Sequence, residues 1–365
     1  MIKLFETRLP EQSFQYVSEV MREGWLSEGV TSRLFESALQ KLLNEPKTLL
    51  VNSGTSALHL ALILAGVKPG DEVIIPSQTF VATGLAVLYV GAKPVLADVN
   101  PTTGEIDISD VKKKITEKTA AIIGVDWGGY PVDYKGLDKL RAGGLIKIIR
   151  DAAHSLLATA NYNINDYADF TCYSFQAIKT LTTGDGGAVS CKSLFDFERG
   201  KKLRWFGIDR DNDNIDESGE RKYNLREVGY KYHMNNVAAA IGLGQIDTIQ
   251  GEVDDRQYIA KSYLSYFCCT PGITVPNYVR ERQSSYWLFP ILVEARYALR
   301  TKLFQNGIES SVVHQGIDRN TIFGGLDDTL KGQRRLDREL LHIPIRGNLS
   351  LADFDKIIKC IREGW

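Results

Sequence analysis

Lys179 is the residue of this chain whose surroundings most favour covalent chemistry. It lies in a short polar and Gly-rich connection between two apolar runs, residues 170–175 and 188–191. If both runs are buried strands, the lysine has little access to water, and burial disfavours its charged form. An amine with a lowered pKa is a nucleophile that can form a Schiff base with a carbonyl compound. The alternative interpretation is a lysine that extends from a loop into solvent.

A second group of residues suits a phosphate. Residues 52–56 read Asn-Ser-Gly-Thr-Ser, follow a short apolar run at 49–51 and open an apolar helix predicted over 57–65. A glycine between hydroxyl residues at a helix start leaves backbone N–H groups near the positive end of the helix dipole. An ordinary Ser/Thr helix cap is the alternative. The spacing matches neither G-x-G-x-x-G nor G-x-x-x-x-G-K-[ST], so dinucleotide and nucleoside-triphosphate binding are disfavoured.

Chemistry-bearing residues recur just beyond the ends of predicted strands. Apolar strands alternate with helices through the first two thirds of the chain, which predicts a mostly parallel sheet covered on both faces. Functional groups in such sheets gather at the carboxyl ends of the strands. The residues found there are Gly54, Phe80, Asp126, Asp151 and Lys179.

The elements that would position these residues divide the chain in two. Strands are predicted at 49–51, 71–76, 94–98, 120–125, 146–150, 170–175 and 188–191. Helical patterns cover 11–45, 57–65, 77–90, 111–115, 137–141 and 234–249. After a long helical stretch at 253–267, a strand at 288–293 and helices near 298–306 and 351–364 follow. We therefore expect a large domain over 1–250 and a small C-terminal domain over 251–365.

Bulk composition excludes several classes of function. The 365 residues are 44% hydrophobic and 24% charged with a net charge of -1, which favours neither nucleic acid nor an anionic membrane as a partner. No apolar run has the length of a membrane span, and no hydrophobic signal segment opens the chain. Five scattered cysteines favour free thiols in a reducing cytoplasm. The five histidines do not fall at metal-ligand spacings, so we expect no metal site.

Pyridoxal 5'-phosphate is the cofactor that such a set of residues would suit. Its aldehyde takes a lysine as a Schiff base, and its pyridinium nitrogen needs a carboxylate to stay protonated. Its phosphate prefers N–H and hydroxyl groups, and its ring face prefers stacking. A buried lysine, a strand-end acid, a phosphate-ready helix start and an aromatic side chain meet all four needs.

The sequence resembles the DegT/DnrJ/EryC1/StrS family of sugar aminotransferases, which are pyridoxal-phosphate enzymes of the aspartate aminotransferase fold (fold type I). The matching segments occur in family order over about the first two thirds of the chain, and the C-terminal third matches only loosely. They are Asn-Ser-Gly-Thr-Ser-Ala-Leu (52–58), Pro-Ser-Gln-Thr-Phe-Val-Ala-Thr (76–83), Asp-Ala-Ala-His-Ser (151–155), Ser-Phe-Gln-Ala-Ile-Lys (174–179), Thr-Thr-Gly-Asp-Gly-Gly (182–187) and Gly-Tyr-Lys-Tyr-His-Met-Asn-Asn (229–236). The resemblance implies an α/β fold with a large domain built on a mostly parallel, seven-stranded type of sheet and a smaller α+β domain.

The resemblance also implies a role for individual residues. Lys179 is similar to the Schiff-base lysine that carries the proton, Asp151 to the partner of the pyridinium nitrogen, and His154 to the residue that hydrogen-bonds the ring hydroxyl. Positions similar to those of other cofactor contacts are Gly54, Thr55 and Ser174 for the phosphate, Phe80 for ring stacking, and Asn236 for a phosphate held in the neighbouring subunit. A homodimer with shared active sites would follow.

The implied reaction moves an amino group, with L-glutamate as the expected donor, to a nucleotide-linked keto-sugar such as an NDP-4-keto- or 3-keto-6-deoxyhexose. A sugar dehydratase of the same family is an alternative, but that branch replaces the lysine that is present here. A lyase of the same fold and a regulatory or scaffold homologue without turnover are further alternatives. The run Asp-Trp-Gly-Gly-Tyr-Pro (126–131) and the segment around His314, a candidate substrate contact, depart from the family pattern.

The diphosphate of such a substrate would need local positive charge, because the chain is nearly neutral overall. Arg204 and Arg210 are the candidates, and they precede a polar loop at 209–220 that would order over the nucleotide. The alternative is a basic surface pair beside a buried Trp205.

Overall fold

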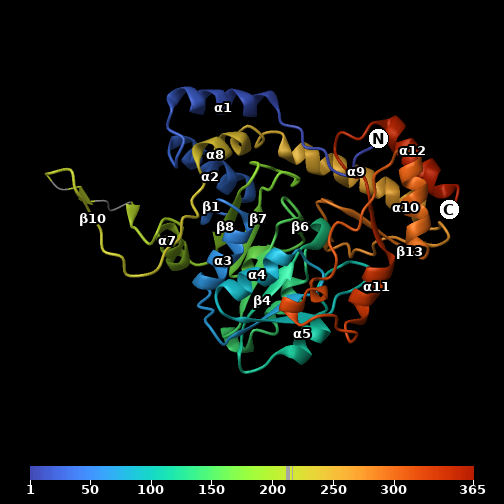
Figure 1. Ribbon diagram of the computed structural model, residues 1–365, viewed down its shortest axis with the longest axis horizontal. Coiled ribbons are helices and arrows are strands. Elements are labelled where there is room, and N and C mark those ends of the chain that lie inside the picture. The colour runs from blue at the N-terminus through green and yellow to red at the C-terminus, as the bar shows by residue number, and fades with distance from the viewer. Residues whose placement is uncertain (211–213, 216) are drawn as a thin grey trace.

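The computed structural model describes residues 1–210, 214–215 and 217–365, and its described part is built on a seven-stranded sheet (Figure 1). The strands, in sheet order, are β1 (Thr48–Val51), β8 (Gly187–Cys191), β7 (Phe170–Ser174), β5 (Lys147–Asp151), β4 (Thr119–Val125), β2 (Glu72–Pro76) and β3 (Lys93–Ala97). In this sheet β8 runs antiparallel to its neighbours β1 and β7, and the other pairs are parallel. The predicted mostly parallel α/β sheet is therefore confirmed.

Helices cover this sheet because its strands are apolar along their whole length. β4 and β5 are buried at nearly every position, as are the helices α3 (Gly54–Leu64) and α4 (Val81–Tyr89), so both faces of the sheet need cover. The other helices of this part are α1 (Glu11–Glu23), α2 (Val30–Leu43), α5 (Ile108–Lys114), α6 (Tyr134–Asp138), α7 (Leu194–Leu203) and α8 (Asn236–Leu243). Residue 80 caps α4 rather than lying inside it, because the chain at Phe80 is still extended.

The C-terminal part has its own small sheet and its own apolar core. β11 (Ile273–Thr274), β13 (Phe289–Val293) and β14 (Leu340–Ile343) pair antiparallel. The helices α9 (Ile249–Phe267), α10 (Arg296–Gln305) and α12 (Leu351–Arg362) pack around them, and α11 (Lys331–Glu339) leads into β14. The division at residue 250 stays a prediction, although α9 begins beside it.

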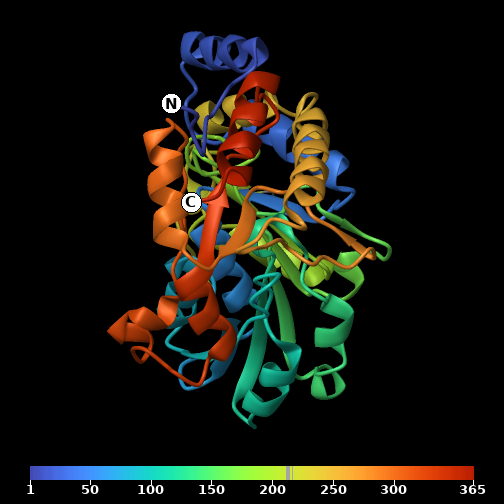
Figure 2. The same cartoon turned by 90° about the vertical axis from the view of Figure 1, so that its right-hand side faces the viewer.

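The N-terminal residues are joined to this C-terminal part. Ile2 forms a parallel bridge with Ile308, and the N–H of Leu4 donates to Glu309. Both views place the N-terminus beside the orange and red elements of the C-terminal part (Figures 1 and 2). Phe5 continues this path inward and stacks on Trp287 with ring centroids 5.4 Å apart.

The predicted polar loop at 209–220 contains part of a hairpin. Of this loop, residues 211–213 and 216 lie outside the described part. β9 (Asn214–Ile215) pairs antiparallel with β10 (Arg221–Lys222), and Figure 1 shows this arm extending away from the large sheet. A further small pair joins β6 (Thr159–Ala160) to β12 (Arg282–Gln283).

Candidate active site

Lys179 lies in the connection between β7 and β8, beside the carboxyl ends of the parallel strands. Burial lowers the pKa of its amine from 10.5 to about 7, although the charge of Asp151 acts in the opposite direction. Its Nζ stands 3.9 Å from the centre of the Trp287 ring, whose face attracts the cationic form. Near neutral pH a large fraction of this lysine is therefore an unprotonated, nucleophilic amine.

Asp151 is the last residue of β5 and is 4% exposed. The Thr83 hydroxyl donates to its Oδ2 at 2.9 Å, and the N–H of Ala153 donates to its Oδ1 at 3.2 Å. Burial raises the pKa of this carboxyl, against the opposing effects of the two hydrogen bonds and the Lys179 charge. A protonated ring nitrogen beside it would relieve this cost, because it would pair the buried carboxylate with an opposite charge.

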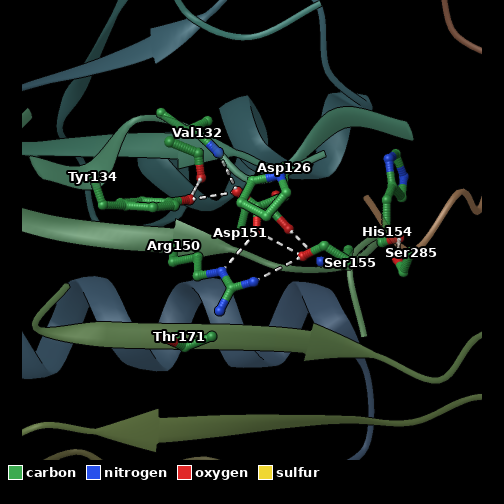
Figure 3. Close-up of polar contacts among 12 residues, drawn as sticks. Asp126, Val132, Tyr134, Arg150, Asp151, His154, Ser155, Thr171 and Ser285 are labelled. Carbon is green, nitrogen blue, oxygen red and sulfur yellow. Dashed lines mark hydrogen bonds and ion pairs between the residues drawn. The ribbon is translucent and has the colours of Figure 1, made fainter. Parts of the chain in front are cut away.

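Asp126, the other strand-end acid, has a structural role instead (Figure 3). It is fully buried, and its Oδ2 accepts from Arg150 Nε at 2.6 Å and from the Ser155 hydroxyl at 2.6 Å. Its Oδ1 accepts from the Tyr134 hydroxyl at 2.9 Å. Asp126 is thus saturated by its own chain.

Aromatic rings line the space next to Lys179. The rings of His154 and Trp287 stack with centroids 4.0 Å apart and planes 28° apart. His314 stacks on the same His154 at 5.5 Å and contacts Phe80 at 5.2 Å. Phe80 itself is 52% exposed, so one of its faces is open for stacking. The structure therefore brings together His154, Phe80 and His314, three residues that lie far apart in the sequence.

The histidines of this group are neutral at pH 7. Burial and the Lys179 charge hold the pKa of His154 well below 6.5, and burial first and Lys179 second lower that of His314 to about 4. The N–H of Gly128 donates to Nδ1 of His154 at 3.3 Å, which assigns the ring proton to Nε2. Nε2 of His314 is buried and has no hydrogen-bond partner among the described residues, so it can serve a ligand.

The start of α3 and the end of β7 meet closely enough to form a cradle. A Cβ atom on Gly54 would lie 2.8 Å from Cβ of Ser174, so any side chain at position 54 would fill this space. Ser53 caps the N–H of Ser56 at 3.0 Å. Within the described residues, the N–H groups of Gly54 and Thr55 have no protein partner, which leaves them available to an anion.

Asn236 does not point from this chain toward another subunit. It is 3% exposed at the start of α8, where its Oδ1 accepts from the N–H of Ser32 and its Nδ2 donates to the carbonyl of Trp25, each at 3.0 Å. Its side chain thus fixes the 25–32 turn. A contact with a phosphate held by a neighbouring subunit stays a prediction.

Arg204 and Arg210 lie near the 25–36 segment rather than in the Lys179 loop. Arg204 forms ion pairs with Glu36 at 2.5 Å and with Glu28 at 3.4 Å, and Arg210 pairs with Glu28 at 2.9 Å. The guanidinium of Arg210 also stands over the Trp205 ring at 4.9 Å. Substrate binding by this pair would have to compete with these acids.

Sequence reasoning missed Trp287 and Thr83. Trp287 links Lys179 to His154, and its indole N–H donates to the carbonyl of Ile178 at 2.8 Å. It comes from the C-terminal third, where no motif singled it out. Thr83 had one usable signal, since its spacing of four from Thr79 places both hydroxyls on one helical face, where they lie 2.7 Å apart.

The residues present fit pyridoxal phosphate. The open helix start and the missing Cβ of Gly54 suit a phosphate, Asp151 suits a ring nitrogen, and Lys179 suits an aldehyde. Among the described residues, no group of three His, Cys, Asp or Glu side chains could hold a metal ion. Nor does any helix of the described part have the length and apolar character to cross a membrane.

Comparison with known proteins agrees with this geometry. Residues 8–362 match the DegT/DnrJ/EryC1/StrS aminotransferase family. GDP-perosamine synthase of Escherichia coli O157:H7 is 30% identical over 317 residues, which cover 86% of this chain and 84% of that protein. The crystal structure of the sugar aminotransferase CalS13 from Micromonospora echinospora superposes with a TM-score of 0.94 and 31% identity, over 100% of both chains.

The PLP-form of the sugar aminotransferase Spr1654 from Streptococcus pneumoniae, described as putative, has a TM-score of 0.90 and 27% identity, over 99% of this chain and 98% of that one. The likeness extends over the whole chain, including the C-terminal third in which the sequence motifs are weak. The chain therefore belongs to the DegT/DnrJ/EryC1/StrS aminotransferase family, and its cofactor is pyridoxal 5'-phosphate.

Proposed function

We propose that the protein transfers an amino group from L-glutamate to the keto carbon of a nucleotide-linked sugar, an NDP-4-keto- or 3-keto-6-deoxyhexose. The observation that carries this is the buried amine of Lys179, whose pKa of about 7 suits it to both nucleophilic attack and proton transfer. The related GDP-perosamine synthase and the dTDP-4-dehydro-2,3,6-trideoxy-D-glucose 4-aminotransferase of Saccharopolyspora spinosa support a nucleotide-linked substrate.

Pyridoxal phosphate supplies an aldehyde and an electron-withdrawing ring when it is bound. The N–H groups of Gly54 and Thr55, with Ser174, would hold its phosphate, and Phe80 would cover its ring. Asp151 would keep the ring nitrogen protonated, and His154 would face the ring hydroxyl. Nζ of Lys179 would carry the proton between carbon atoms of the reacting group.

The substrate side is supported by fewer contacts. The unpartnered Nε2 of His314 could accept from or donate to a sugar hydroxyl, because the neutral ring can adopt either tautomer. Arg204 and Arg210 remain the proposed residues for the diphosphate. The presence of Lys179 disfavours a dehydratase, and the complete set of Lys179 and Asp151 disfavours a scaffold protein without turnover.

A product assay tests this function. The purified holoenzyme is incubated with glutamate and a panel of nucleotide-linked keto-sugars, and the products are weighed by mass spectrometry. We expect an amino sugar with at least one keto-sugar, and none with Lys179→Ala. Loss of the sugar hydroxyl without gain of nitrogen would identify a dehydratase instead.

The assembly and location belong to the same proposal. Large apolar side chains on α1, the 25–34 segment and α7 are exposed, among them Phe14, Trp25, Leu34 and Phe195. Such a surface is typical of a subunit interface and supports a homodimer. A cytoplasmic location stays a prediction that rests on the five free cysteines.

A further inference from the structure

A second feature of the Lys179 loop is a cavity of about 410 Å³ on which Lys179 and Thr180 open. Its walls come from three other segments: α9, the chain that follows β14, and the N-terminal residues 6–10. A cavity of this size suits a small molecule. The two arginines in its wall are Arg256 and Arg346.

Arg256 is a cation without an ion-pair partner among the described residues. Its side chain donates to the Thr180 hydroxyl at 3.2 Å, while its Nε is buried and has no hydrogen-bond partner there. Burial lowers the pKa of this guanidinium, and Glu252, one helical turn earlier, offsets that only by its charge at a distance. A guanidinium stays charged in proteins, so a buried one with unused N–H groups favours an anion beside it.

Arg346 is 9% exposed and lies across the cavity wall in the segment after β14. It forms an ion pair with Glu6, and its Nε is buried without a hydrogen-bond partner in the described part of the chain. Glu6 sits in the N-terminal segment that crosses the Lys179 loop, where the Thr7 hydroxyl donates to the carbonyl of Ala177. A carboxylate from the chain itself therefore already occupies one arginine of the cavity.

The chemistry of the cavity favours a carboxylate over other small ligands. A planar guanidinium binds a carboxylate through two parallel N–H donors, and Glu6 shows that a carboxylate fits at Arg346. The phosphate of the cofactor has its own place at the start of α3. The ligand that must bring a carboxylate to Lys179 in the proposed reaction is the amino-acid donor.

We propose that Arg256 and Arg346 bind the carboxylates of the amino donor and select a dicarboxylic acid, and that Glu6 occupies Arg346 until the donor arrives. This inference rests on the proposed aminotransferase function. A purely structural reading would have the two arginines join α9 and the C-terminal part to the Lys179 loop. The two readings differ in what the removal of Glu6 does.

The test measures binding of glutarate, an unreactive dicarboxylate, to the holoenzyme by titration calorimetry. Arg256→Gln and Arg346→Gln should each raise the dissociation constant at least about tenfold, since each removes a charge-assisted hydrogen-bond donor. Glu6→Gln should lower it about threefold or more, because it removes the internal competitor. Arg300→Gln, on the exposed side of α10, is the matched control and should change nothing.

The same variants separate this proposal from the function on which it rests. Arg256→Gln should raise KM for glutamate and leave KM for the nucleotide-sugar unchanged, as expected for lost donor binding. Glutarate that binds as weakly as butyrate to the wild-type holoenzyme, or as tightly to Arg256→Gln and Glu6→Gln as to the wild type, would overturn the carboxylate site. Because glutarate binding needs no turnover, a holoenzyme that binds it but aminates no sugar would contradict only the proposed function. If an arginine variant does not fold, the Glu6→Gln result and the glutarate-to-butyrate ratio still decide.

Discussion

At the scale of single residues, the site separates two acids that look alike in the sequence. Asp126 and Asp151 both follow apolar strands, but Asp126 is fixed by Arg150, Ser155 and Tyr134. Asp151 keeps a carboxylate that the chain stabilises only in part. The first acid holds the strand ends together, and the second is available to a ligand.

This separation predicts opposite effects for two substitutions of the same kind. Asp151→Asn should fold normally and still bind cofactor, while kcat falls at least about a hundredfold because the charge that holds the ring nitrogen protonated is gone. Asp126→Asn should instead destabilise the protein by about 3 kcal/mol or more, because Arg150 loses its buried partner. Urea denaturation and steady-state kinetics on both variants check this. Near-normal turnover of Asp151→Asn would show that another residue faces the ring nitrogen.

The lowered pKa of Lys179 predicts a pH-dependent cost in the cofactor-free protein. Between pH 7 and 10.5 the unfolded state binds a proton that the folded state does not, so this residue makes stability rise with pH across that window. Lys179→Met should therefore raise the free energy of unfolding most at pH 7 and below, by as much as a few kcal/mol at about 1.4 kcal/mol per pKa unit, and least near pH 10.5. Chemical denaturation of both proteins at several pH values measures the difference. A gain that is equal at all pH values would contradict the assigned pKa.

At the scale of elements, the site depends on the close approach of α3 and β7. The register of β7 against β8 pairs Ser174 with Gly187, and that of β1 against β8 pairs Val51 with Gly187. This pairing places the start of α3 against Ser174, where only a glycine at position 54 leaves room. The phosphate site is therefore a property of three strands and one helix start.

A methyl group at position 54 should consequently weaken cofactor binding through the phosphate alone. Gly54→Ala should lower the affinity for pyridoxal phosphate about tenfold or more, the effect of roughly 1–3 kcal/mol of overpacking. Its affinity for pyridoxal, which has no phosphate, should hardly change and serves as the control. Equal losses for both compounds, measured by absorbance titration, would mean that the helix start has a general rather than a phosphate-specific effect.

The ion pairs near β9 and β10 refine the proposed diphosphate contact. Arg204 is held by two acids, so its removal would disturb the fold, whereas Arg210 shares Glu28 and is about a third exposed. Arg210→Ala should raise KM for the nucleotide-sugar with little change in kcat, and should leave the glutamate half-reaction unchanged. An unchanged KM would place the diphosphate elsewhere.

At the scale of the whole molecule, the sequence predicted the large sheet better than the C-terminal part. Strand ends in a parallel sheet share one edge, so Lys179, Asp151 and Gly54 could be predicted to meet from their positions after apolar runs. Trp287 and Arg346 could not, because they reach the site through a small antiparallel sheet whose pairing is not local in sequence. Asn236 was assigned from a motif, and the contacts that occupy its amide come from residues 25–32, over 200 positions away.

Assembly is the prediction that belongs to this scale. If the exposed apolar side chains on α1 and α7 form a two-fold interface, the smallest active species is a dimer. Sedimentation at assay concentrations, combined with activity across the peak, should show a dimer as the active form. An active monomer would rule out a shared site.

The bridge between Ile2 and Ile308 also bears on how the protein is made. Leu4 and Glu309 are 305 residues apart, so a ribosome adding 5–20 residues per second needs roughly 15 to 60 s between them. During this time the strands that carry Asp151 and Lys179 emerge and can pair, while Phe5 and Glu6 have no partner to dock on. The nascent chain therefore exposes the Lys179 loop before the N-terminal segment covers it, which gives the cofactor an early opportunity to enter during synthesis.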